Sequence, residues 1–128
     1  MELGSGAGFL KDLNSEVITS EVFECDGIDM VLDACGHLPF DDGALRAILM
    51  TDVFHHLPDV RAFFRESARA VAAGGVISMI EPWVTPWSKV IYGRLHHEPF
   101  DLSAREWEFK SGGGGGGRCQ WQTARCRG

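Results

Sequence analysis

The start of the chain combines a carboxylate with closely spaced glycines. Glu2 is followed by Gly4, Gly6 and Gly8, and single residues separate these glycines. Glycine has no Cβ, so such a turn bends tightly and lets its backbone approach a ligand closely. The phosphate-binding pattern G-x-G-x-x-G would need its third glycine where this chain has Phe9. A carboxylate directly before the turn would repel a pyrophosphate and attract an ammonium or sulfonium group. The turn therefore favours a cationic ligand.

Candidate proton acceptors occur at two further places. Histidines form two adjacent pairs, and acidic residues end an apolar run and follow the second pair: His55, His56, His96, His97, Glu81 and Glu98. Any of these groups could take a proton from an oxygen or nitrogen nucleophile. We favour His56 and His97 as catalytic candidates. The alternative for the first pair is that one histidine caps or packs under the next helix while the other is exposed. We predict no metal site, because adjacent histidines in a loop tend to point apart.

The four cysteines show no metal-binding spacing. Cys25 and Cys35 lie in or beside apolar segments, where buried thiols are common. Cys119 and Cys126 are seven positions apart, which fits no zinc pattern. We therefore expect structural thiols, a reducing compartment and a cytoplasmic location.

Short apolar runs and helical patterns must position these groups. Runs rich in Val, Ile, Leu and Met cover residues 17–20, 28–32, 47–51 and 76–80, and residues 1–3 could end another strand. Such runs suit strands that are buried on both faces of a parallel sheet. Strands that alternate with helices predict an α/β fold with a doubly wound, mostly parallel sheet.

The clearest helix follows Pro58 and Asp59. Apolar or small residues recur at helical spacing from 60 to 71, and Gly74 and Gly75 are expected to end the helix. The row formed by Arg61, Arg65 and Arg69 is expected to be a solvated face without function. A second helix is expected near residue 86, with an apolar stripe of core residues at 87, 90, 91 and 95.

Length and composition exclude several classes. The 128 residues suffice for one domain, which we place at residues 1–110, and the glycine-rich residues 111–128 are expected to be a disordered tail without function. No apolar run reaches the ~18–20 residues that cross a bilayer, so no membrane partner is expected. The formal net charge of −6 disfavours nucleic acid.

Four segments together resemble the class I S-adenosylmethionine-dependent methyltransferases, and in particular their type 11 domain. The stretch ELGSGAG at 2–8 resembles the family's first motif, and Glu21 follows Glu2 by nineteen positions, about the spacing of the family's ribose-binding acid. The stretch DACGHLPF at 33–40 resembles a segment after the third strand, and TDVFHHLPD at 51–59 resembles the exit of the fourth strand. The resemblance covers about residues 1–100 and implies a Rossmann-like fold.

The resemblance implies that S-adenosylmethionine lies across the carboxyl ends of the strands. Glu2 would hold the methionyl ammonium, Glu21 the ribose hydroxyls and Asp33 the adenine amino group. The backbone of the glycine turn, of Ala34 and of the end of the fourth strand would complete the site. The backbone groups implied are those of Gly4, Ser5, Gly6, Gly8, Ala34, Thr51 and Asp52. The reaction would be an in-line methyl transfer to a small-molecule acceptor, promoted by alignment and desolvation.

Departures from the family pattern leave two alternatives open. The chain begins directly before the motif acid, residues 22–27 are too few for the usual helix, and the tail replaces the last strands, so we expect a fragment that is incomplete at both ends. One alternative is a non-catalytic cofactor-binding or interaction module of the same fold. The other, disfavoured by Phe9 and the 33–40 segment, is an NAD(P)-dependent oxidoreductase. Aromatic residues could border an acceptor pocket or pack in the core: Trp83, Trp87, Phe100 and Trp107.

Overall fold

The computed structural model of the protein describes residues 1–6 and 8–81. The elements in chain order are β1 (Glu2–Leu3), α1 (Phe9–Leu13), β2 (Thr19–Glu21), β3 (Met30–Val31), β4 (Leu45–Thr51), the 3-10 helix η1 (Phe54–His56), α2 (Val60–Ala70) and β5 (Val71–Ile80). The predictions for the helix near residue 86, for the second histidine pair, for the aromatic group and for the tail all lie outside the described residues.

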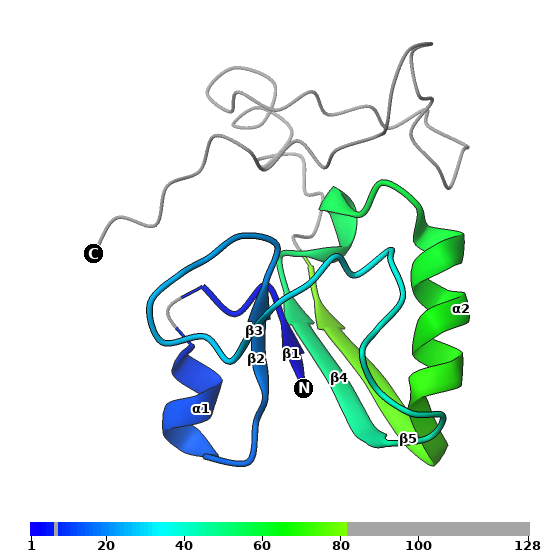
Figure 1. Ribbon diagram of the computed structural model, residues 1–128, viewed down its shortest axis with the longest axis horizontal. Helices are drawn as coiled ribbons and strands as arrows, with labels where there is room; N and C mark the ends of the chain where they lie inside the picture. The colour runs from blue at the N-terminus through cyan, green and yellow to red at the C-terminus, as the bar shows by residue number, and fades with distance from the viewer. Residues whose placement is uncertain (7, 82–128) are drawn as a thin grey trace, which may run out of the picture.

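The five strands form one parallel sheet in the order β3-β2-β1-β4-β5. β1 lies in the middle, where Glu2 is opposite Thr19 of β2 on one side and Leu49 of β4 on the other. The sheet stands between α1 and α2 (Figure 1). The predicted doubly wound α/β fold is therefore confirmed for the described part of the chain. Because the chain leaves β1 toward β2 and later returns to β4, the strand order reverses beside β1, which is where such sheets bind ligands.

The apolar core lies between the sheet and α2. Phe63 of α2 is fully buried, as are Ile48 of β4 and Leu38 of the β3–β4 connection. Phe54 of η1 packs against Phe63 edge to face, with ring centroids 6.3 Å apart. Burying side chains of this size is the main contribution to stability in a small domain. The core thereby holds η1 and the β3–β4 connection against the same helix.

The helix α2 begins as predicted but ends earlier. The Asp59 carboxylate caps it by accepting a hydrogen bond of 2.8 Å from the Ala62 N–H. The helix ends at Ala70, and Val71 already belongs to β5, where it is opposite Leu45. The prediction that the helix continues to the glycine pair is therefore wrong.

The glycine pair instead lies inside β5, at a shift in the register between β4 and β5. Gly74 has φ +80°, which glycine adopts without a steric penalty. A Cβ on Gly75 would lie 2.5 Å from Val71 Cγ1 and 2.7 Å from the Arg46 carbonyl oxygen. Glycine at these positions thus allows a β-bulge. In the sequence, the same glycine pair resembles a signal that ends a helix.

The β2–β3 connection, the arginine row of α2 and the cysteines were also predicted from the sequence. Residues 22–29 contain no helix, as the short spacing predicted. Arg69 is not part of a solvated row, because its side chain is only 24% exposed and binds the β3–β4 connection. Cys25 is disulfide-bonded, which contradicts the prediction of a thiol there, and the half-buried Cys35 packs against the core as expected. No helix in the described part of the chain is long and apolar enough to span a membrane.

Candidate functional site

A pocket of about 180 Å³ opens at the carboxyl ends of β1, β2, β3 and β4. The segments that follow these strands all contribute to its wall. The lining residues are Leu3, Gly4, Ser20, Glu21, Val22, Phe23, Leu32, Asp33, Ala34, Thr51, Asp52, Val53, His56, Leu57 and Pro58. This is the edge at which open α/β sheets bind their ligands. Four segments that are far apart in the sequence thus meet in one cavity.

The pocket is acidic and otherwise largely apolar. Glu21, Asp33 and Asp52 line it from the ends of three different strands, and none of the described residues in its wall is a lysine or an arginine. Most of the remaining wall consists of aliphatic and aromatic side chains. Three carboxylates favour a cation and accept hydrogen bonds from hydroxyl and amino groups, whereas they repel phosphate. The pocket therefore suits a positively charged ligand with an apolar body.

The glycine turn adopts the left-handed backbone conformation that favours glycine. Gly4, Gly6 and Gly8 have φ values of +64°, +52° and +74°. A Cβ on Gly4 would lie 2.4 Å from Cγ2 of Val53, the residue before η1. The missing side chain at position 4 therefore lets the β1 exit and the β4 exit approach each other on one side of the pocket. The predicted tight turn is confirmed.

The turn is also bonded to β2. The Gly6 N–H donates to Glu21 Oε1 at 2.7 Å. Ser5 is buried, its Oγ accepts a hydrogen bond from the Ser20 N–H at 3.0 Å, and its own N–H donates to the Ser20 carbonyl at 3.0 Å. Ser5, Gly6 and Gly8 do not line the pocket. These three residues therefore shape the turn, whereas Gly4 lines the pocket.

Glu2 is buried and incompletely bonded. Its side chain is only 2% exposed, and its Oε2 has no hydrogen-bond partner among the described residues. Burial raises the pKa of Glu2 above its usual value, a hydrogen bond from Ser5 lowers it, and the nearby charge of Glu21 raises it further. A buried carboxylate oxygen without a donor is costly, and natural sites of this kind usually have a role. Glu2 lies in the central strand β1 and does not line the pocket.

The first histidine pair is held in place by a carboxylate from β5's end. Glu81 Oε1 accepts hydrogen bonds from the N–H groups of Phe54, at 2.7 Å, and Val53, at 3.2 Å. Glu81 Oε2 lies 2.5 Å from Nδ1 of His55. The His55 and His56 rings lie against each other, with centroids 3.9 Å apart, and only His56 lines the pocket. Glu81 therefore caps η1 and positions His55.

The structure brings most of the predicted site together. Six of the ten predicted cofactor residues line the pocket together with His56, and they are Gly4, Glu21, Asp33, Ala34, Thr51 and Asp52. His97 lies outside the described residues. Within residues 1–6 and 8–81, no group of three or more side chains could hold a metal ion. Sequence reasoning missed the apolar wall formed by Val22, Phe23, Val53, Leu57 and Pro58, although each of these residues closely follows a predicted strand.

Comparison with known proteins decides the family. The family model described as a methyltransferase domain matches residues 7–79, more than half of the chain. The chain belongs to the methyltransferase domain family. The predicted class I S-adenosylmethionine-dependent methyltransferase is thereby confirmed at the level of the family. Comparisons with curated proteins and with solved structures gave no significant match. The matched range includes the acidic residues of the pocket and the first histidine pair of this methyltransferase domain.

Proposed function

We propose that this methyltransferase domain binds S-adenosylmethionine in the acidic pocket and transfers its methyl group to a small-molecule acceptor. One observation carries the proposal: the carboxylates of Glu21, Asp33 and Asp52 surround an apolar pocket whose described wall contains no lysine or arginine. A ligand with a sulfonium charge, an ammonium group, ribose hydroxyls and an aromatic base matches each of these properties.

The residues present fit the cofactor. Glu21 is available to accept from the ribose hydroxyls, and Asp33 from the adenine amino group beside the Ala34 backbone. Thr51 and Asp52 line the pocket at the end of β4, where we assign the methionyl part of the cofactor. The unpartnered, buried Oε2 of Glu2 supports a role in holding the methionyl ammonium.

In the proposed reaction, the residues of this chain contribute positioning and proton transfer. The cofactor, when bound, supplies a methyl carbon that its sulfonium makes electrophilic. In the proposed reaction the pocket walls would exclude water and fix the direction of attack, which are the main contributions to an in-line displacement. His56 lines the pocket, and in this proposal it accepts the proton of a hydroxyl or amine acceptor as the new bond forms. The three acids oppose the phosphates of a dinucleotide, which disfavours the oxidoreductase alternative.

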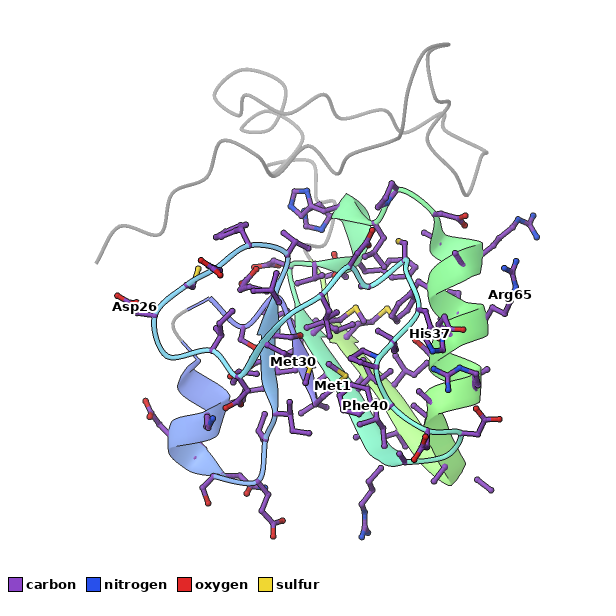
Figure 2. The ribbon with its side chains drawn as sticks, viewed as in Figure 1. Met1, Asp26, Met30, His37, Phe40 and Arg65 are labelled. Atoms are coloured by element: carbon purple, nitrogen blue, oxygen red, sulfur yellow. The ribbon has the colours of Figure 1, made fainter. Side chains whose placement is uncertain are left out.

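Calorimetry with the full 128-residue chain tests the proposal. We expect the wild type to bind S-adenosylmethionine and not NADH. Glu21→Gln and Asp33→Asn should weaken binding about 10- to 100-fold, because each loses a hydrogen bond to a charged group. The matched control is Asp26→Asn, an exposed acid in the β2–β3 connection that points away from the molecule (Figure 2). It should bind like the wild type. Failure to bind the sulfonium compound, or preference for NADH, would refute the proposal.

Methyl transfer is tested separately with methyl-labelled cofactor and a panel of small hydroxyl, amine and thiol acceptors. We expect His56→Asn to slow transfer to the hydroxyl and amine acceptors while the Kd of the cofactor is unchanged. Label that stays with a tightly bound cofactor across the whole panel would instead favour a non-catalytic binding module.

A further inference from the structure

Two side chains of α2 fasten the connection between β3 and β4. Leu38 lies in this connection, and both of its backbone groups are bonded by α2 side chains. Its N–H donates to Glu66 Oε2 at 3.1 Å, and its carbonyl accepts from Arg69 Nη2 at 2.9 Å. The Leu38 carbonyl also accepts from the Phe40 N–H at 2.8 Å, so the α2 side chains bond the one N–H and share the one carbonyl of a residue that has no strand partner.

Arg69 extends the attachment along the connection. Its Nη1 donates to the Phe40 carbonyl at 2.8 Å and to Asp42 Oδ1 at 2.9 Å. Its own backbone carbonyl accepts from the Gly43 N–H at 2.8 Å. The planar guanidinium thus bonds three residues of the connection at once, which a lysine ammonium would not reproduce.

The two side chains also bond each other. Arg69 Nη2 and Nε lie 2.9 and 3.1 Å from Glu66 Oε2, and His37 Nδ1 lies 3.1 Å from the same oxygen. The hydrogen bond from Arg69 is the main reason that the pKa of Glu66 falls to about 2, and the bond to Glu66 raises the pKa of Arg69. Charge-assisted bonds of this kind are stronger than neutral ones. The attachment therefore persists through the neutral pH range.

The fastened segment begins at the pocket. Asp33 and Ala34 line the cavity, and a turn that starts at Asp33 is closed by bonds from Gly36 N–H to the Asp33 carbonyl, at 3.0 Å, and from Cys35 N–H to Asp33 Oδ1, at 2.9 Å. Only His37 separates this turn from Leu38. On the other side, the pairing of β3 with β2 holds the chain. The segment that carries Asp33 is therefore fixed on both sides: the pairing of β3 with β2 holds it before Asp33, and the side chains of α2 hold it after the turn.

We propose that Glu66 and Arg69 are positioning residues for the nucleoside end of the bound cofactor. Neither side chain lines the pocket, and both act through the segment 33–40. The inference rests on the proposed function, because it concerns the affinity of that same site. Substitutions without ligand contact commonly change coupling by a few-fold to about 30-fold.

The test compares Arg69→Gln and Glu66→Gln with Arg65→Gln. Arg65 lies on the same helix, is exposed and points away from the connection (Figure 2), so it is a matched control. The probes are S-adenosylhomocysteine and 5′-methylthioadenosine, which lacks the amino-acid end. We expect the Arg69 and Glu66 variants to bind both probes on the order of tenfold more weakly, by the same factor, and the Arg65 variant to bind like the wild type.

A second measurement separates positioning from general stability. Arg69→Lys keeps the charge without the planar fork, so it is expected to fold and yet to bind both probes more weakly. Hydrogen exchange at the Cys35 and Gly36 amides should accelerate in this variant while exchange in β4 is unchanged. Folded variants that bind both probes like the wild type, or that lose affinity only for the longer probe, would overturn the inference. A wild-type chain that binds neither probe would overturn the proposed function, and this inference with it.

Discussion

A methyl group added at Gly4 should lower the stability of the fold, and the size of this loss reports how closely the exits of β1 and β4 approach each other. In Gly4→Ala, the new Cβ would be placed 2.4 Å from Val53 Cγ2, on a residue whose φ is +64°. Both effects destabilise the folded chain, one by steric overlap and one by backbone strain. Gly6→Ala is the matched control, because Gly6 has φ +52° and nothing lies within 4 Å of its hypothetical Cβ.

The two effects have separate magnitudes. A left-handed conformation costs a residue with a Cβ about 1–2 kcal/mol. Overpacking a filled site costs about 1–3 kcal/mol. We therefore expect Gly4→Ala to lower the free energy of unfolding by about 2–5 kcal/mol, and Gly6→Ala by only about 1–2 kcal/mol.

Urea unfolding followed by far-UV circular dichroism gives these free energies. The double variant Gly4→Ala with Val53→Ala removes the overlapping methyl, so the two changes should be coupled favourably by about 1–3 kcal/mol. The strain in φ should remain. Equal losses at positions 4 and 6, together with no coupling to Val53, would show that the strand exits do not touch and would refute this reasoning.

Three other perturbations address charge and capping. Burial raises the folded-state pKa of Glu2 above 4.5, so the folded chain holds more protons than the unfolded chain between pH 4.5 and the raised pKa, and the resulting loss of stability is complete above that raised pKa. Glu2→Gln should therefore stabilise the chain in urea unfolding at pH 7, and the difference should vanish below pH 4. The hydrogen bond from Lys11, followed by those from Thr19, lowers the pKa of Asp29 to about 2, so Asp29 stabilises the fold above pH 3.8 and loses this effect as the pH falls toward 2. An acid titration should show a shallower loss of structure in Asp29→Asn, and an unchanged titration would contradict the ion pair. Asp59→Ala should lower the free energy of unfolding by about 1 kcal/mol through the lost cap of α2, and Asp59→Asn should restore most of it.

The fold class was predictable because its signals are local. Four of the five strands, β2 to β5, overlap a short apolar run of the sequence, and the helix α2 has its cap at Asp59 directly before it. The end of α2 was not predictable, because apolar spacing continues through Val71 and the glycines resemble a helix stop. What decides this boundary is the pairing of Val71 with Leu45, which no local pattern reveals.

The site shows the same division. The acids that line the pocket follow strands directly, so the parallel order of the strands brings them together. The contacts of Glu81 with η1 and of Arg69 with the β3–β4 connection join residues 26 to 31 positions apart, and they depend on which loops the core brings together. An arginine on a helix face has the same sequence pattern whether it is solvated, like Arg65, or bonded to a loop, like Arg69.

Asp52 has a consequence for the adaptation of this domain to heat. It has φ +56°, although it carries a side chain, and its N–H is held by the Ile80 carbonyl at 2.8 Å. Asp52→Gly would relax this backbone and stabilise the folded chain by up to about 1 kcal/mol. The same change would delete one of the three negative charges of the pocket. On the proposed function, the substitution that stabilises the fold at this residue is therefore also expected to weaken binding of the cofactor.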